Sequence, residues 1–199
     1  MPVRGPKTGA YLLKPVVFVL CLLPLAVYLA GFFTDRLGAN PIDELADASG
    51  VWTMRFLLLT LAMTPLRRIS GWYWPPRLRR MLGLFAFFYA SLHLLSYLWL
   101  DQFFEWPEIG ADILERPFIA VGMLGYVLLL PLAATSNRAM MRRLGSAWQR
   151  LHRLAYVVPA LGVLHFWWLV KADVREPLFY GLALALLLWS RMLRKTGGG

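Results

Sequence analysis

The chain has 199 residues, of which 59% are apolar and 15% aromatic, and its formal net charge is +10. This composition, with its positive mean hydropathy, is typical of a membrane protein rather than of a soluble domain of the same length. The charge does not indicate nucleic-acid binding, because the basic residues lie beside apolar runs, where membrane orientation and anionic headgroups account for them. The single cysteine, Cys21, lies inside the first apolar run, which excludes an internal disulfide.

Six apolar runs follow one another along the chain, each close to the length that crosses about 30 Å of hydrocarbon at about 1.5 Å per residue. The first run is long and no small-x-small cleavage site follows it, so we expect an anchor rather than a removed signal peptide. We therefore predict an all-α polytopic membrane protein, a single domain over residues 1–199 built as a six-transmembrane-helix bundle in the lipid bilayer. The predicted spans are 14–33, 51–66, 81–100, 118–134, 151–170 and 177–193.

Acidic and basic residues alternate between the segments that separate these runs. All 11 Asp and Glu residues fall in segments 34–50, 101–117 and 171–176. Most of the 21 Lys and Arg residues fall in the two terminal segments and in segments 67–80 and 135–153. Short loops rich in Lys and Arg stay cytoplasmic during insertion. We expect both termini in the cytoplasm and the acidic segments on the periplasmic or outer side.

His93, His152 and His165 are the only histidines in the chain. His93 lies about seven residues, or about 10 Å, below the outer end of its span and His165 about five residues below its own, so we expect both imidazoles in one layer. Two neutral imidazoles that face each other from neighbouring helices can hold a b-type haem without covalent attachment. The alternative is a packing role, in which each histidine bonds a neighbouring helix, but the cost of burying ionisable groups in one shared layer favours ligation.

His152 lies about 20 Å lower along the same helix, close to the cytoplasmic interface. Two interpretations stay open: a ligand for a second haem layer, or an interfacial residue that touches headgroups between Arg150 and Arg153. Positions 79 and 80, where span three would need a facing histidine, are both arginine. The number of haems, one or two, stays open with it.

Arg55 is the only formal charge well inside a predicted span, about four residues below its outer end, near the expected depth of His93 and His165. Its guanidinium either neutralises a haem propionate or snorkels to the outer interface, and both interpretations stay open. The arginines of segment 135–153 are chiefly an orientation signal, with a phosphate-bearing cofactor or partner as the alternative.

Three stretches resemble one known family, and the resemblance covers nearly the whole chain. They are residues 53–66 (TMRFLLLTLAMTPL), 79–93 (RRMLGLFAFFYASLH) and 148–156 (WQRLHRLAY), the last followed by His165-Phe166-Trp167. They are similar to the haem-binding membrane subunits of the MsrQ (YedZ) family, which belongs to the ferric reductase-like transmembrane domains.

The resemblance implies haem on the third and fifth helices, with His93 and His165 at the ligand positions and His152 at the family's third histidine. It also implies FMN binding, electrons from the quinone pool or a cytosolic flavin reductase, and a partner, MsrP. This partner is a periplasmic molybdopterin enzyme that reduces methionine sulfoxide in oxidised proteins, which implies a bacterial inner membrane. Because the chain holds no Gly-x-Gly-x-x-Gly fingerprint, the reductant is expected to be separate.

Two other functions stay open at this stage. One is a stand-alone ferric reductase that passes electrons to extracellular metal, and the other is a haem-free membrane transporter or scaffold that uses the histidines for protons or packing. The missing nucleotide-binding fingerprint weighs against the first, and the lack of any carboxylate within a span weighs against the second. The sequence favours an electron-transfer subunit rather than a catalytic one.

Overall fold

A computed structural model describes residues 9–170 and 172–196, and within them the chain is helical with no strand, as predicted. The helices are α1 (Gly9–Phe33), α2 (Pro41–Ser70), α3 (Pro75–Leu95), its π-helical continuation η1 (Ser96–Asp101), α4 (Trp106–Glu115), α5 (Pro117–Ala134), α6 (Arg138–Leu144), α7 (Ser146–Leu151), α8 (Leu154–Leu169) and α9 (Arg175–Thr196).

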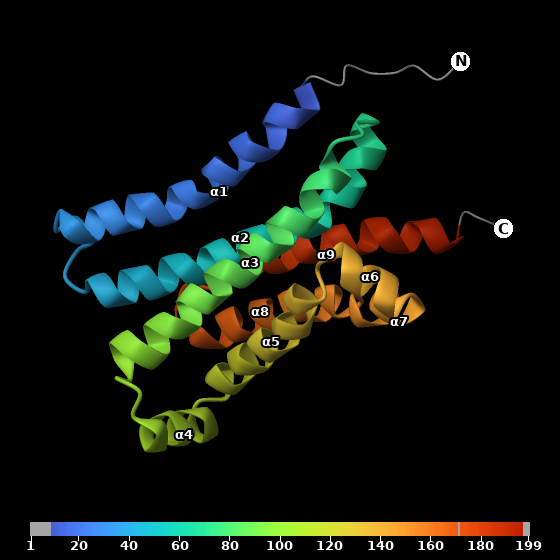
Figure 1. Ribbon diagram of the computed structural model, residues 1–199. Coiled ribbons are helices and arrows are strands. Elements are labelled where there is room, and N and C mark those ends of the chain that lie inside the picture. The colour runs from blue at the N-terminus through green and yellow to red at the C-terminus, as the bar shows by residue number, and fades with distance from the viewer. Residues whose placement is uncertain (1–8, 171, 197–199) are drawn as a thin grey trace, which may run out of the picture.

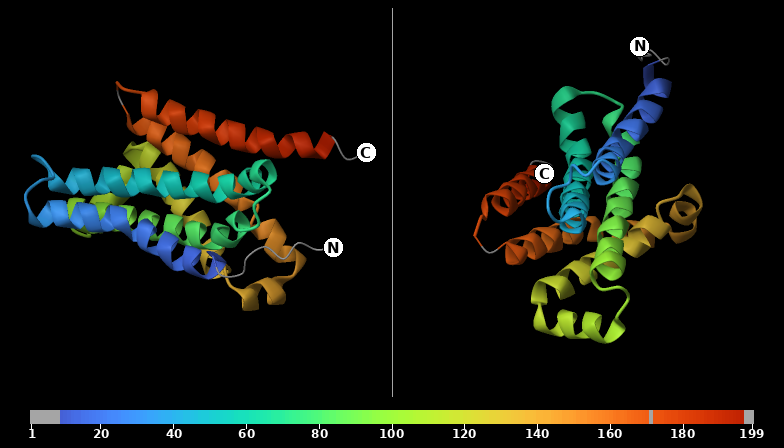
Figure 2. Two further views of the ribbon diagram at one scale, coloured as in Figure 1. Left: turned by 90° about the horizontal axis from the view of Figure 1, so that it is seen from above. Right: turned by 90° about the vertical axis from the view of Figure 1, so that its left-hand side faces the viewer.

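The long helices run side by side as a bundle built around two close pairs, α2 with α3 and α5 with α8 (Figure 1). α9 packs along α2 and α8, and α1 covers the pair of α2 and α3, as two further views show (Figure 2). The α2–α3 turn and helices α6 and α7 lie at one end of the bundle, whereas the α1–α2 turn and α4 lie at the other. Basic segments therefore gather at one end and acidic segments at the opposite end.

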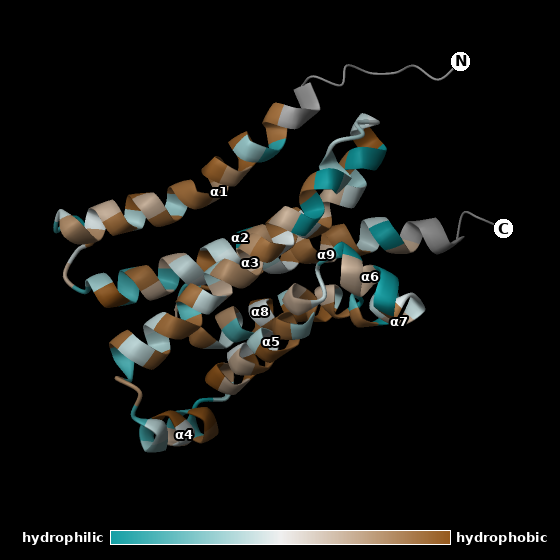
Figure 3. Ribbon diagram, in the orientation of Figure 1, coloured by the Kyte–Doolittle hydropathy of each residue, from teal (hydrophilic) through white to brown (hydrophobic). Residues whose placement is uncertain are grey.

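Four helical stretches are long and apolar enough to cross a membrane: Leu12–Phe33, Pro41–Ser70, Pro75–Asp101 and Pro117–Ala134. They contain the first four predicted spans, and apolar residues dominate their middle turns (Figure 3). α8, which carries most of the fifth predicted span, has 16 residues. The count of six spans and the cytoplasmic position of both termini stay predictions, which the separation of charges at the two ends supports.

α2 begins ten residues before the predicted span 51–66. Asn40 caps the helix by accepting a hydrogen bond from the backbone N–H three residues on, and Pro41 takes the first helical position, where its missing N–H costs nothing. The predicted spans had left this stretch in an acidic loop, and that prediction is wrong. As a helix, it brings Ala46 and Gly50 against His93 of α3, in the site described below.

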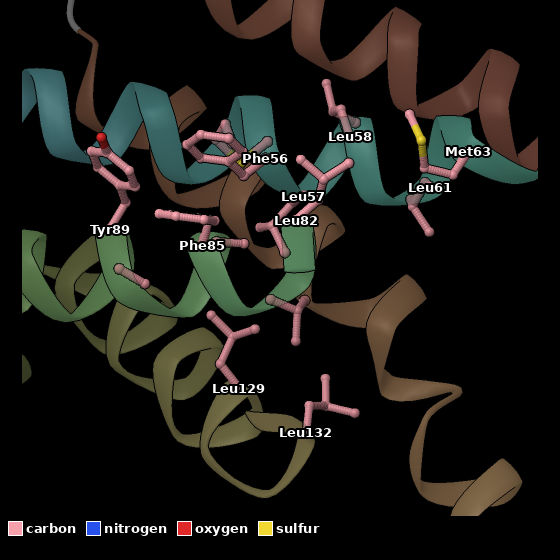
Figure 4. Close-up of a cluster of buried hydrophobic side chains, with 14 of the residues drawn as sticks. Phe56, Leu57, Leu58, Leu61, Met63, Leu82, Phe85, Tyr89, Leu129 and Leu132 are labelled. Atoms are coloured by element: carbon pink, nitrogen blue, oxygen red, sulfur yellow. The ribbon is translucent and has the colours of Figure 1, made fainter. Parts of the chain in front are cut away.

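The core between α2 and α3 is aromatic. Phe56 stacks against Phe85 and Tyr89, with ring centres 5.7 and 5.2 Å apart, and all three rings lie between the two helices (Figure 4). The Tyr89 hydroxyl donates to the backbone oxygen of Cys21 at 2.9 Å and accepts from the backbone nitrogen of Leu25 at 3.1 Å. Because these two backbone groups would otherwise pair within α1, the hydroxyl inserts into the helix and ties it to α3.

Candidate functional site

His93 of α3 and His165 of α8 lie next to each other inside the bundle. Their ring centres are 6.1 Å apart and their planes stand at 81°. Both side chains line one cavity of about 830 Å³, whose walls come largely from α2, α3, α5 and α8. The prediction that these two histidines share one layer is confirmed by this proximity.

Each imidazole is held by a backbone carbonyl of the neighbouring helix. Nδ1 of His93 lies 2.9 Å from the oxygen of Ala46 on α2, and Nδ1 of His165 lies 2.7 Å from the oxygen of Phe118 on α5. A carbonyl oxygen only accepts hydrogen bonds, so Nδ1 carries the proton in each neutral ring and Nε2 keeps its lone pair. Neither Nε2 makes a hydrogen bond within residues 9–170 and 172–196. This is the arrangement in which histidine binds a metal through Nε2.

The cavity wall is apolar over most of its depth and charged at the end that carries the acidic segments. Buried Met54, Leu57, Leu129 and Val158 line its apolar part. Arg116 also lines it, and its guanidinium pairs with the carboxylate of Asp112, one helical turn earlier, at 3.3 Å. The carboxylate residues that line the cavity are Asp43, Asp47, Asp101, Asp173 and Glu176.

Comparison with known proteins places this chain in a family. A model described as "Ferric reductase like transmembrane component" matches residues 49–163, more than half of the chain. A "Protein-methionine-sulfoxide reductase heme-binding subunit MsrQ" of Azospira oryzae is 52% identical over 92% of this chain and 79% of its own length. Proteins of the same name from Herminiimonas arsenicoxydans and Rhodospirillum rubrum are 51% and 55% identical, over 91% and 89% of this chain and 84% and 86% of their own lengths.

The chain belongs to the MsrQ family. The resemblance carried by residues 53–66, 79–93 and 148–156 is confirmed by these matches. The family model covers His93 and ends two residues before His165.

Arg55 lies outside the histidine cavity of this MsrQ-family chain. Its Nε donates to the hydroxyl of Tyr180 on α9 at 3.2 Å, and its guanidinium lies 4.6 Å from the ring centre of Trp52. The side chain is exposed on the outer surface of the bundle. Its position therefore gives no support to the propionate interpretation, whereas Arg116, which the sequence reasoning missed, does line the cavity.

His152 lies away from the histidine pair, between α7 and α8. Its ring stacks on Trp148 with ring centres 3.9 Å apart, and its Nε2 lies 3.0 Å from the hydroxyl of Thr135. The indole of Trp148 donates to the backbone oxygen of Thr135 at 3.0 Å, so Trp148, His152 and Thr135 all contact one another. His152 is thus fixed by stacking and hydrogen bonding at the basic end of the bundle.

The carbonyls of Ala46 and Phe118 were also missed from the sequence. A recurrent spacing was the available signal, because each carbonyl belongs to the residue 47 positions before its histidine. A glycine, Gly50 or Gly122, follows one helical turn after each carbonyl. Backbone acceptors carry no side-chain signature, so only this spacing could have indicated them.

Proposed function

We propose that this MsrQ-family chain is a haem b-containing transmembrane electron-transfer subunit of a protein-methionine-sulfoxide reductase system. It passes electrons from the quinone pool or a cytosolic flavin reductase to MsrP, a periplasmic molybdopterin enzyme that reduces methionine sulfoxide in oxidised proteins. The observation that carries the proposal is the adjacent pair of His93 and His165, each with Nδ1 bonded to a carbonyl and with no hydrogen-bond partner for Nε2 among the described residues. The relatives named as heme-binding subunits support it.

The spacing of the two rings fits a shared iron. Bonds between a metal and an imidazole nitrogen are about 2.0 Å long. If both rings bound the same iron, with each ring centre about one ångström beyond its nitrogen, the ring centres would lie at most roughly 6 Å apart. The observed separation is 6.1 Å. The separation of the two rings is thus compatible with His93 and His165 holding one haem iron between them.

The donor set favours a haem over a bare metal ion. Within the described residues, no group of three or more His, Cys, Asp and Glu side chains could hold a metal. Two imidazoles suffice only where the remaining ligands come from a macrocycle such as porphyrin. The cavity of about 830 Å³ falls in the range of roughly 300–1,000 Å³ that is usual for ligand sites.

When bound, haem supplies a reversible one-electron couple of its iron inside the membrane. Groups of the chain itself would set the reduction potential of the haem and its exposure to water. The hydrogen bonds to the carbonyls of Ala46 and Phe118 raise the basicity of both imidazoles, which favours the oxidised iron and lowers the potential. Arg116 would sit beside propionates at the charged end of the cavity, and the apolar wall keeps water away.

The inner half of the electron path belongs to the same proposal. One haem at the outer layer leaves much of the bilayer uncrossed, so we assign the inner relay to a second haem at His152 or to FMN. His152 directly follows α7, one of the helices at the basic end of the bundle, and this position supports the first choice. The arginines of α6 and α7 would suit the phosphate of FMN, which the family resemblance implies.

The proposed setting is a bacterial inner membrane, crossed six times with both termini in the cytoplasm. The basic end of the bundle would then face the electron donors, and the acidic end would face the partner. The charged end of the histidine cavity opens among the acidic segments, so the outer haem would lie on the side where MsrP works.

An optical and transfer experiment tests the proposal. Purified protein supplied with haem should show a Soret band and a reducible b-type α band. Its dithionite-reduced form should be reoxidised by MsrP with methionine sulfoxide but not at a comparable rate by ferric citrate. Preferred reoxidation by ferric citrate would indicate a ferric reductase, and the absence of any haem band would indicate a haem-free transporter or scaffold.

A further inference from the structure

The two histidines are held by the same three-part unit, which occurs twice in the chain. Each unit has a carbonyl on one helix, a glycine one turn later on that helix, and a histidine on the next helix of the pair. The second unit stands 72 residues after the first at all three positions. The units are Ala46, Gly50 and His93, and Phe118, Gly122 and His165.

In each unit the imidazole rests against the bare Cα of the glycine. A Cβ atom added at Gly50 would stand 3.1 Å from Cε1 and 3.2 Å from Nδ1 of His93. At Gly122 the added atom would stand 2.8 Å from Nδ1 and 3.0 Å from Cε1 of His165. The second contact is closer than real Cβ atoms accept, and its nearest atom is the nitrogen that bonds the carbonyl of Phe118.

We propose that Gly50 and Gly122 are positioning residues that set the orientation of the two imidazole planes. In each unit the hydrogen bond to the carbonyl fixes the position of Nδ1. The glycine has no side chain, so the ring can occupy the space that a Cβ atom would fill. The result is the angle of 81° between the planes, close to the perpendicular. The inference rests on the proposed function, because the consequence of this angle is read on the haem iron.

The orientation matters because each imidazole interacts with the iron d orbitals through its π system. When the two imidazole planes are perpendicular, each ring interacts with a different dπ orbital, so the two orbitals stay nearly equal in energy. Ferric low-spin iron then gives a strongly anisotropic EPR signal with a large maximal g value. When the planes are parallel, both rings interact with the same dπ orbital, so the two orbitals differ in energy. The EPR signal is then rhombic, with a smaller maximal g value. The chain's geometry therefore predicts the strongly anisotropic type.

Alanine is the natural test substitution, because it is a better helix former than glycine. Gly50→Ala and Gly122→Ala should keep their helices intact, so a spectral change reports the contact with the ring. Gly83→Ala on α3 is the matched control, since its added Cβ would stand 3.7 Å from the Thr60 side chain, an ordinary contact. Gly83 does not line the histidine cavity.

The experiment compares EPR spectra, haem-to-protein ratio and helical circular dichroism of the four haem-supplied full-length proteins. Gly122→Ala should shift the signal to a smaller maximal g value and a more rhombic shape, or lose haem while staying helical. Gly50→Ala should show the same change to a smaller extent, and Gly83→Ala should match the parent.

Parent-like EPR spectra and full haem in both folded variants, Gly50→Ala and Gly122→Ala, would overturn the inference. If Gly122→Ala does not fold, Gly50→Ala decides by the same readings. A parent protein with no low-spin signal would instead contradict the proposed function, so the two failures are distinguishable.

Discussion

The guanidinium of Arg191 donates a hydrogen bond of 2.8 Å from Nη2 to the backbone oxygen of Leu61, joining α9 to α2. This oxygen lacks its helical partner because Pro65, four residues on, has no N–H. Arg191 also donates to the hydroxyl of Tyr156 on α8. One half-buried arginine thus satisfies a carbonyl freed by a proline and holds three helices together.

Arg191→Leu should therefore destabilise the folded bundle by about 1–3 kcal/mol, the usual cost of leaving a buried acceptor without its donor. The measurement is unfolding in detergent, followed by circular dichroism. In a Pro65→Ala background the restored N–H supplies the Leu61 oxygen, so the same substitution should cost less. Arg68→Leu, which removes an exposed hydrogen bond to the Ser190 oxygen, is the control. Equal costs of Arg191→Leu in both backgrounds would contradict this role of Pro65.

Arg116 and Arg55 should differ in their effect on the haem potential. Arg116 lines the histidine cavity, so Arg116→Gln should lower the midpoint potential by tens of millivolts, because a lost nearby positive charge disfavours the electron-richer reduced state. Arg55→Gln should leave it unchanged, since that side chain contacts Trp52 and Tyr180 instead. Redox titration of both variants measures this, and the reverse order of effects would restore the propionate interpretation of Arg55.

His152→Ala should separate the inner relay from the outer pair. The low-spin signal of the haem at His93 and His165 should persist, while its reduction by a flavin reductase or quinol should slow by roughly tenfold or more, a usual size for the loss of a group that supports a metal site. Stopped-flow absorbance measures this rate. Trp148→Phe keeps a ring against His152 and should stay close to the parent rate. A parent rate in His152→Ala would make this histidine an interfacial packing residue.

Haem should stabilise the folded chain, because it fills the cavity and joins α3 to α8 through two imidazoles. Protein produced without haem should unfold at a lower temperature than haem-supplied protein, and the difference should disappear in His165→Ala. Thermal unfolding of the four samples measures it. If His165→Ala gained as much stability from haem as the parent, the haem would be bound elsewhere.

Hydrophobic runs and depth along a helix predicted much of the fold and the central pair of the site. His93 and His165 were placed in one layer by counting residues from the ends of apolar spans, because a helix rises by a fixed amount per residue. The all-helical fold followed from run lengths, and the family from local motifs. These signals are local in the sequence, which explains why they could be read without a structure.

Contacts between helices could not be predicted in the same way. Counting residues gives Arg55 a depth but no direction, and its side chain lies against Trp52 and Tyr180. The N-terminal turns of α2 were assigned to a loop because they contain acidic residues. The capping residue Asn40 and the following Pro41 are the sequence signals of a helix start at this point. The depth of a residue follows from counting positions along its helix, whereas the direction of its side chain depends on how the helices pack together.

The most direct test of the account is the spectrum and haem content of His93→Ala and His165→Ala beside the parent. If the two imidazoles hold one haem iron, each substitution should abolish the low-spin signal of that haem, or convert it to high spin, and should stop electron delivery to the methionine sulfoxide reductase. Circular dichroism would confirm that both variants are folded. An unchanged low-spin spectrum in either folded variant would contradict the central claim.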